Sequence, residues 1–185
     1  GFDSTLSVTM EMMINHSAAV RKGAPNSFII SDMPYMSYQV SVEDAVRNAG
    51  TIMQKTGVDG VKLEGGSEMA DRITAIVRAG IPVMGHIGLT PQSLSLLGGY
   101  KAQGRETKAA LQLIENAKNL EEAGCFSIVL EAIPSEVAEI ITERASIPII
   151  GIGAGPGCDG QVLVINDLLG YFAGRTARFV KQYAD

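Results

Sequence analysis

Residues 60–80 read GVKLEGGSEMADRITAIVRAG, a short apolar run that leads through an acid and two glycines into a segment with helical spacing. An apolar run with little alternation is typical of a strand covered on both faces of a parallel sheet. Gly80 follows the helical segment, at the position where a glycine commonly ends a helix. The stretch therefore predicts one strand and one helix, joined by a tight turn.

The same unit recurs along the chain. Besides residues 60–63, apolar runs bounded by Gly and Pro predict strands at residues 27–31, 81–85, 126–130, 147–152 and 161–165. Helical spacing predicts helices at residues 8–20, 42–56, 67–79, 107–123 and 135–145. Repeated strand–helix units build a parallel α/β sheet with right-handed crossovers. A doubly wound sheet and a (β/α)8 barrel both fit this pattern, and we expect the barrel, as a single partial domain over residues 1–185.

The composition excludes several classes of protein. The chain has 185 residues, of which 46% are hydrophobic and 19% charged, and a net charge of −5. Its apolar fraction excludes a disordered chain, and an acidic chain without a Lys/Arg cluster is a poor partner for nucleic acid. The apolar runs are far shorter than the roughly 20 residues that cross a bilayer. Two cysteines, Cys125 and Cys158, are too few for a disulfide scaffold, so we expect a cytoplasmic protein with neither nucleic-acid nor membrane partners.

Glycine is the one residue type in clear excess. The chain has 21 glycines in 185 residues, about 11% against an average of roughly 7%. Many of them follow strand ends, where we expect the backbone to approach a small ligand. Residues 151–155, GIGAG, resemble the phosphate loop of many barrels or a degraded dinucleotide fingerprint. Pro156 and Gly157 argue against the fingerprint, because they stand where it would open a helix.

Three of the predicted strands end in an acid that is followed by Gly or Pro within a few residues. Asp32 closes the first of them, Glu64 the second and Glu131 the fourth. The carboxyl ends of parallel strands form the ligand face of α/β folds, so these acids should converge on one site. Asp32 and Glu64, on neighbouring strands, fit the one or two carboxylates that hold Mg²⁺ together with substrate oxygens. The alternative is that these acids cap turns in solvent.

The same strand ends supply groups for binding and proton transfer. Lys62 lies two residues before Glu64, so both side chains point to one face, where Lys62 would hold an anionic substrate unless it is a surface lysine. Glu131 has apolar neighbours, which suit a general base, although a salt bridge to a helix is the alternative. His86 closes a predicted strand and would orient substrate or shuttle a proton, or serve only as hydrogen-bonded structure.

Several longer motifs occur together and in a fixed order. They are DMPYMSY at residues 32–38, VKLEGG at 61–66, GHIGLTPQS at 85–93, GGYKAQGR at 98–105, GIGAG at 151–155 and CDGQ at 158–161. With these motifs the sequence resembles the ketopantoate hydroxymethyltransferase family, also called 3-methyl-2-oxobutanoate hydroxymethyltransferase. The resemblance runs from residues 1–5 to residues 179–181, nearly the whole chain.

The resemblance implies a (β/α)8 TIM barrel of the phosphoenolpyruvate/pyruvate-binding superfamily and a homo-oligomer, decameric in the bacterial form. Family members transfer a hydroxymethyl unit from 5,10-methylenetetrahydrofolate to 3-methyl-2-oxobutanoate, which gives 2-dehydropantoate for pantothenate and coenzyme A synthesis. By motif, Asp32 would bind Mg²⁺ and lie against the keto acid, and Glu64 would reach the metal through its shell. Lys62 would hold the keto acid and Glu131 would accept its proton. No residue is assigned to the folate.

The sequence departs from the family pattern at its two ends. Family members begin with two further strands, the second of which ends in a Gly-Asp-Ser segment whose Asp is a metal ligand and whose Ser contacts the keto acid. Neither strand precedes Gly1, and a closing helix after Asp185 is also absent. We therefore expect these residues to be the ordered part of a longer chain.

Two other functions are open on sequence alone. A related carbon–carbon lyase or mutase of the same superfamily would use the same metal face on another keto acid, without folate. A noncatalytic module would bind the keto acid or the metal and carry out no turnover. Dependence of the reaction on folate separates the first alternative from the transferase, and binding without turnover identifies the second.

Overall fold

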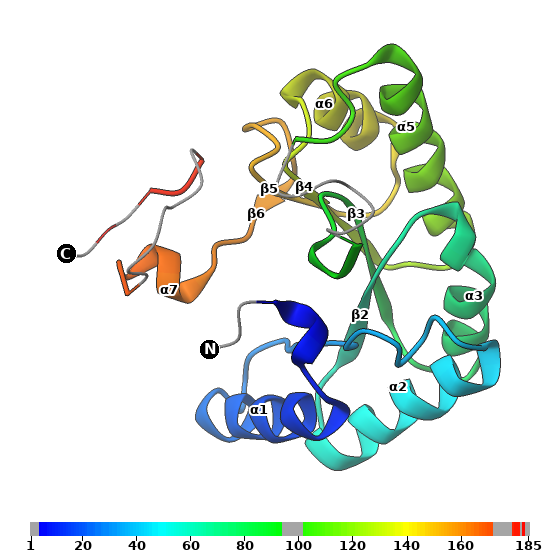
Figure 1. Ribbon diagram of the computed structural model, residues 1–185, viewed down its shortest axis with the longest axis vertical. Helices are drawn as coiled ribbons and strands as arrows, with labels where there is room; N and C mark the ends of the chain where they lie inside the picture. Colours follow the sequence, from blue (N-terminus) through cyan, green and yellow to red (C-terminus); the bar gives the residue numbers. More distant parts are fainter. Residues whose placement is uncertain (1–3, 94–101, 172–178, 182, 184–185) are drawn as a thin grey trace.

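The centre of the fold is a curved sheet of six parallel strands. The computed structural model describes residues 4–93, 102–171, 179–181 and 183. Its strands are β1 (Ile30–Asp32), β2 (Gly60–Glu64), β3 (Val83–Gly88), β4 (Ser127–Glu131), β5 (Ile149–Ile152) and β6 (Gly160–Gln161). They lie side by side in chain order (Figure 1). This order is that of a barrel, because a doubly wound sheet reverses direction at a switch point.

The helices follow one another around the outside of this sheet (Figure 1). They are α1 (Met10–Gly23), α2 (Val42–Thr56), α3 (Ala70–Arg78), α5 (Thr107–Glu122) and α6 (Ser135–Arg144). The short α7 (Ile165–Leu168) lies apart from them, on the open side of the sheet (Figure 1). Three 3₁₀ turns, η1 (Thr5–Ser7), η2 (Ser67–Met69) and η3 (Pro91–Ser93), complete the elements. The expected α/β barrel architecture is confirmed for six of its strands.

The helix boundaries have local causes that the sequence already contains. At the start of α2, the Ser41 side chain accepts a hydrogen bond from the backbone N–H of Asp44, which satisfies one of the free donors of the first turn. At its end, Gly57 takes the left-handed conformation with φ +67°, which a residue with a Cβ adopts only with strain. Gly80 and Gly124 also follow helix ends with positive φ, as predicted.

The two faces of the sheet have different environments because successive side chains of a strand alternate between them. On the outer face, Val61, Leu63, Ile128, Leu130 and Ile149 are buried under the helices. They pack in one cluster with buried side chains of α2, α3, α5 and α6, including Ile52, Ile76, Leu120 and Ile141. On the inner face Val129 and His86 are also buried, whereas Lys62, Met84 and Ile150 are half-buried. The predicted burial of both faces therefore holds for β4 and only in part for its neighbours.

Several predicted strand boundaries are corrected by the structure. The strand expected from residue 27 begins only at Ile30. The strands expected from residues 81 and 147 begin at Val83 and Ile149, just after Pro82 and Pro148, which have no N–H for the ladder. The strand expected at residues 161–165 is wrong. Its ladder ends at Gln161, and the chain then leaves the sheet and enters α7.

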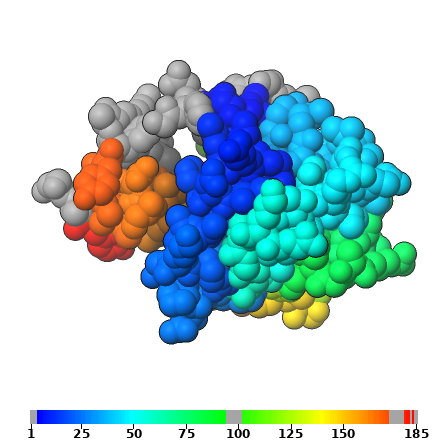
Figure 2. Space-filling model, turned by 90° about the horizontal axis from the view of Figure 1, so that it is seen from below, coloured from blue at the N-terminus to red at the C-terminus, as the bar shows by residue number. Residues whose placement is uncertain are grey.

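The inner face is open on one side of the arc. The elements η1 and α1, in blue, and β6 and α7, in orange, lie at the two ends of the curved sheet (Figure 1). The N-terminal elements, in blue, and the C-terminal elements, in orange, are both visible on the face drawn in the space-filling view (Figure 2). Both ends of the chain therefore stand beside the concave face, where they can contribute to a ligand site.

Candidate active site

The concave face of the sheet lines a cavity of about 560 Å³. The strand register explains which side chains reach it: Asp32 is paired with Lys62, and Glu64 with His86, across neighbouring strands. Glu131 follows Val129, the partner of His86, by two residues, so it points to the same side. The cavity is also lined by apolar side chains of the inner face and of both chain ends, among them Val8, Met13, Ile30, Met84, Ile150, Ile152, Val162 and Val164.

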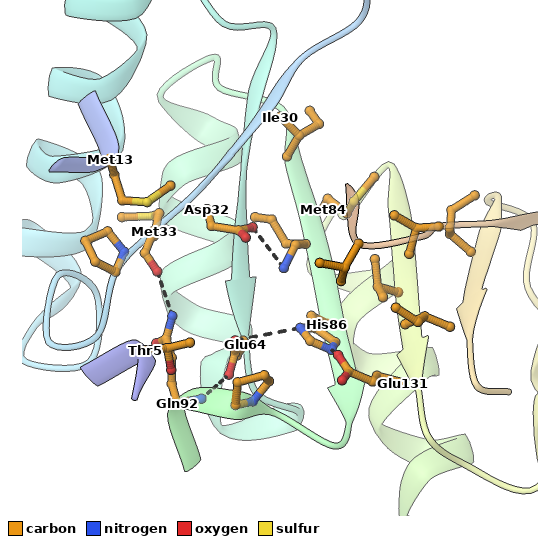
Figure 3. Close-up of a pocket in the computed structure, with 18 of the residues that line it drawn as sticks. Thr5, Met13, Ile30, Asp32, Met33, Glu64, Met84, His86, Gln92 and Glu131 are labelled. Atoms are coloured by element: carbon orange, nitrogen blue, oxygen red, sulfur yellow. Dashed lines mark hydrogen bonds and ion pairs between the residues drawn. The ribbon is translucent and has the colours of Figure 1, made fainter. Parts of the chain in front are cut away.

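Asp32 and Lys62 form an ion pair inside this cavity (Figure 3). Lys62 Nζ lies 2.8 Å from Asp32 Oδ1. The lysine side chain is 19% exposed and the aspartate 53%, so the carboxylate keeps a free side toward the cavity. Burial lowers the pKa of Lys62, but the attraction of Asp32, Glu64 and Glu131 outweighs it, and the pKa is raised overall. Lys62 is therefore an ammonium at neutral pH.

Glu64 is held at the end of β2 by a backbone donor. Its Oε2 accepts a hydrogen bond of 2.9 Å from the N–H of Gln92, and its Oε1 lies 3.9 Å from Nδ1 of His86. Burial raises the pKa of Glu64, and the negative charge of Asp32 adds to this rise, against the opposing effects of the Gln92 N–H and Lys62. Two carboxylates that repel each other on one face form a site that favours a cation.

His86 lies between two carboxylates (Figure 3). Its Nε2 is 3.1 Å from Glu131 Oε2, and the ring is almost completely buried, with 2% of the residue exposed. Among the described residues, neither ring nitrogen has a hydrogen bond of good geometry. A buried imidazole without aligned partners is costly in a merely structural role, so both nitrogens are available to a ligand or to a shifted Glu131.

The backbone around Glu131 is fixed on both sides. The Glu131 carbonyl accepts from Leu89 N–H at 2.8 Å, and the N–H of Ala132 donates to the Ile152 carbonyl at 2.9 Å. Ala132 has φ +49°, a left-handed conformation that is rare for a residue with a Cβ. Backbone strain of this kind is held by the surrounding structure and is concentrated at functional sites. It sets the direction in which the end of β4 presents Glu131.

Gly88 stands against this strand end, and its substitution is expected to disturb it. A Cβ at position 88 would lie 2.3 Å from the carbonyl oxygen of Glu131, and the residue has φ +98°. We expect Gly88→Ala to lower the free energy of unfolding by at least about 3 kcal/mol, measured by urea denaturation, because strain and a backbone clash combine. Gly80→Ala is the matched control: its φ is +86° but nothing lies within 4 Å of the new Cβ. We expect it to cost about 1 kcal/mol, and equal losses would contradict the clash.

The sequence was compared with known families and proteins. It matches the profile described as ketopantoate hydroxymethyltransferase over residues 1–185. The chain belongs to this family. Proteins named 3-methyl-2-oxobutanoate hydroxymethyltransferase from Clostridium novyi and Clostridium beijerinckii are 56% and 58% identical to it over 185 residues. Those alignments cover 100% of this chain and 67% of each relative, so the chain spans about two thirds of their length.

Solved structures agree with the fold of this ketopantoate hydroxymethyltransferase family member. Phosphonopyruvate hydrolase is similar with a TM-score of 0.54 at 13% identity, over 80% of this chain and 53% of that one. The carboxyl transferase domain of Rhizobium etli pyruvate carboxylase is similar with a TM-score of 0.55 at 17% identity, over 91% and 33%. At such identities the likeness concerns the fold alone, a parallel α/β sheet that curves as part of a barrel. No helix within the described ranges is long and apolar enough to cross a bilayer.

The donor set of this ketopantoate hydroxymethyltransferase family member was tested for its fit to Mg²⁺. Within residues 4–93, 102–171, 179–181 and 183, no group of three or more His, Cys, Asp or Glu side chains is placed to hold a metal. Asp32 and Glu64 do, however, supply carboxylate oxygens from neighbouring strand ends to one cavity. Mg²⁺ is commonly bound by one or two carboxylates, with water and substrate oxygens as the other ligands. The residues present fit a magnesium site of that open kind.

The structure brings together all five residues that sequence analysis selected for the site. Asp32, Lys62, Glu64, His86 and Glu131 line the same cavity. His86, predicted to close a strand, lies within β3, two residues before its end. Glu64 does not cap a turn in solvent, because its side chain is only 9% exposed. The ion pair that Glu131 forms within the described residues is with His86 of the sheet, not with a helix.

The glycine-rich stretch after β5 differs from the expectation of a ligand loop. Protein side chains occupy the space beside the glycines at positions 151, 153, 155 and 157. A Cβ at these positions would come within 3 Å of Cys158, Phe179, Ser135 and Glu139, respectively. No helix begins between Gly153 and Gly160, so the segment lacks the helix N-terminus that phosphate loops use. These glycines permit close packing. The GGYK part of another motif, residues 98–101, lies outside the described residues.

Two polar residues near the site were not selected from the sequence. Tyr38 and Gln92 stand only inside two of the longer motifs, DMPYMSY and GHIGLTPQS. The structure places Tyr38 in the interior, hydrogen-bonded to Gln92, and Gln92 on the cavity wall. The missed signal is the run of polar groups in the turn after β3, at residues 90–93, directly beyond the strand that carries His86.

Proposed function

We propose that this protein transfers a hydroxymethyl unit from 5,10-methylenetetrahydrofolate to 3-methyl-2-oxobutanoate and so forms 2-dehydropantoate. The observation that carries the proposal is the convergence of Asp32, Lys62, Glu64 and Glu131 on one cavity, in a chain of the ketopantoate hydroxymethyltransferase family. The cavity combines a permanent cation, two carboxylates suited to a metal and a third carboxylate beside a histidine. These are the groups that proton removal next to a ketone requires.

Lys62 binds the carboxylate of the keto acid in this proposal. Its ammonium has three N–H donors, and the ion pair with Asp32 uses one of them. The side chain is mostly buried, so an anion that reaches it is little screened by water. The apolar lining of the cavity, which includes Met84, Ile150 and Ile152, suits the branched hydrocarbon end of the same molecule.

Glu131 removes the proton from C3 of the keto acid. The electron pair of the broken C–H bond moves toward the ketone, and the proton stays on the Glu131 carboxylate, 3.1 Å from His86 Nε2. His86 lies beside that carboxyl group, whose side chain is 18% exposed and so open to the keto acid. C3 then forms a bond to the methylene carbon of the folate while one of the two C–N bonds of that carbon breaks, and the freed nitrogen takes the proton from Glu131. Water gives its hydroxyl group to the methylene carbon as the second C–N bond breaks, its remaining proton goes to the second nitrogen, and tetrahydrofolate leaves.

Asp32 would hold Mg²⁺ directly, and Glu64 would hold it through its shell. When bound, Mg²⁺ supplies Lewis-acid stabilisation of the negative charge that develops on the keto oxygen, worth several kcal/mol. Both side chains are presented at carboxyl ends of neighbouring strands, so neither strand has to move to receive the ion. In agreement with the family resemblance, we also propose a cytoplasmic homo-oligomer, whose size light scattering would measure.

Dependence on folate tests the proposed reaction. The protein is incubated with 3-methyl-2-oxobutanoate and Mg²⁺, with or without 5,10-methylenetetrahydrofolate, and products are identified by mass spectrometry. We expect 2-dehydropantoate only when the folate is present. Conversion of the keto acid without folate would favour a lyase or mutase, and binding of the keto acid without any turnover would favour a noncatalytic module. Either result would overturn the proposal.

A further inference from the structure

Tyr38 has a completely buried side chain whose hydroxyl group bridges two strand ends. The residue is 0% exposed. Its hydroxyl oxygen accepts a hydrogen bond from the backbone N–H of Glu64 at 3.1 Å. The single phenolic proton has two acceptors in reach, Gln92 Oε1 at 2.8 Å and the Glu64 carbonyl at 3.2 Å, and the shorter distance assigns it to Gln92. Burial raises the pKa of Tyr38, so the phenol keeps this proton.

Gln92 connects the same hydroxyl group to the end of β1 and, a second time, to the end of β2. Its side-chain nitrogen Nε2 donates to the carbonyl of Met33 at 2.9 Å, and Met33 directly follows Asp32. Its backbone N–H donates to Glu64 Oε2, also at 2.9 Å. The Nε2 donor fixes the orientation of the side-chain amide, because Oε1 must then face the Tyr38 hydroxyl. The turn after β3 is thus tied to the ends of β1 and β2 through one glutamine.

The network acts on the two proposed metal-binding carboxylates. Among the described residues, the Glu64 carboxylate accepts a backbone hydrogen bond only from Gln92. The direction of the carboxylate therefore depends on the position of the turn that carries Gln92. The position of the turn depends on the Gln92 side chain, whose Nε2 donates to Met33 and whose Oε1 accepts from Tyr38 and, at 3.2 Å, from Gln39 Nε2. Asp32 is not touched, but its neighbour Met33 is anchored. A shift of the turn would therefore move Glu64 relative to Asp32.

We propose that Tyr38 and Gln92 are positioning residues that hold Glu64, relative to Asp32, in the arrangement that binds the divalent cation. This inference rests on the proposed function, because it takes these two carboxylates as the metal-binding pair. Neither residue touches the reacting atoms in the proposal. A preorganised pair of carboxylates avoids the ordering of side chains that would otherwise oppose cation binding.

Tyr38→Phe tests the inference, since it removes the hydroxyl group and keeps the ring. We expect the dissociation constant for Mg²⁺, measured by isothermal titration calorimetry with the keto acid present, to rise about tenfold. The kcat at saturating Mg²⁺ should stay within about twofold, because the reacting groups are unchanged. Gln92→Ala should weaken Mg²⁺ binding to a similar extent. The double variant should bind Mg²⁺ with about the same affinity as the weaker-binding single variant, because both substitutions disrupt the same network.

Thr56→Val is the matched control for a merely structural effect. The Thr56 hydroxyl group is also buried, donates to the Ile52 carbonyl at 2.7 Å and accepts from Val58 N–H at 3.3 Å, at the end of α2. We expect Thr56→Val to lower the melting temperature as Tyr38→Phe does, with unchanged Mg²⁺ affinity.

The outcomes separate the inference from the proposed function. If the unsubstituted protein binds Mg²⁺ but Tyr38→Phe and Gln92→Ala bind it equally well, the positioning role is wrong. If Tyr38→Phe does not fold, Gln92→Ala, in a turn, decides the question alone. If the unsubstituted protein binds no Mg²⁺ even with the keto acid present, the metal site of the proposed function fails first, and this inference fails with it.

Discussion

Glu131→Gln is expected to abolish the exchange of the C3 proton of 3-methyl-2-oxobutanoate with deuterated water, while Mg²⁺ still binds. An amide has nearly the shape of the carboxylate and can still lie beside His86 Nε2, but it does not accept a proton at neutral pH. A positioned general base contributes about 10²–10⁴-fold to the rate of proton transfer. We therefore expect exchange, followed by nuclear magnetic resonance of the C3 proton, to fall by at least about 100-fold.

The control for this substitution is Glu143→Gln. Glu143 is an exposed residue of α6, on the outside of the sheet. It undergoes the same chemical change and loses the same charge, so it reports the effect of net charge alone, and we expect exchange to stay within about twofold. Calorimetry with Mg²⁺ shows whether the Glu131→Gln cavity is intact. Retained exchange in an intact cavity would remove Glu131 as the base and leave His86 as the next candidate.

The residues of the site could be predicted where a local rule fixes their direction. Asp32, Glu64 and Glu131 each end an apolar run, and parallel strands bring such ends to one edge. Lys62 follows from alternation, because it lies two residues before Glu64 on the same strand. The same rule applied to β3 and β5 also accounts for Met84, Ile150 and Ile152 on the inner face. The strand order and the two-residue alternation of side chains along each strand thus account for most of the cavity wall.

The contacts that orient these groups could not be predicted in this way. Tyr38 and Gln92 are 54 residues apart, and their hydrogen bond depends on the paths of two loops rather than on any periodic pattern. The same limit explains the strand expected at residues 161–165. Residues 162–165, VLVI, form an apolar and largely β-branched run that favours a strand, but pairing stops after Gln161. Propensity is local, whereas a strand needs a partner at the right distance.

Lys62→Met is expected to weaken binding of 3-methyl-2-oxobutanoate by about 100-fold and to leave Mg²⁺ binding unchanged or stronger. The keto acid carboxylate loses the cation that Lys62 provides, and truncating one partner of a desolvated, hydrogen-bonded charge pair costs about 2–5 kcal/mol. Asp32 is freed from its 2.8 Å ion pair at the same time, and the positive charge that repels a metal disappears. Calorimetry measures the affinity for the keto acid and the affinity for Mg²⁺ separately. We expect the first to fall, and the second to rise or to stay unchanged.

This divergence distinguishes a binding role from a structural one, because a disordered cavity would weaken both ligands together. Lys118→Met serves as the control: its ion pair with Glu122, at 3.7 Å, has both side chains 63% exposed, and such pairs contribute little. We expect it to change neither affinity by more than about twofold. Unchanged keto acid binding in Lys62→Met would show that the anion is held elsewhere. Lys62→Arg, which keeps the charge but alters its geometry, should recover part of the lost affinity if charge is the main contribution.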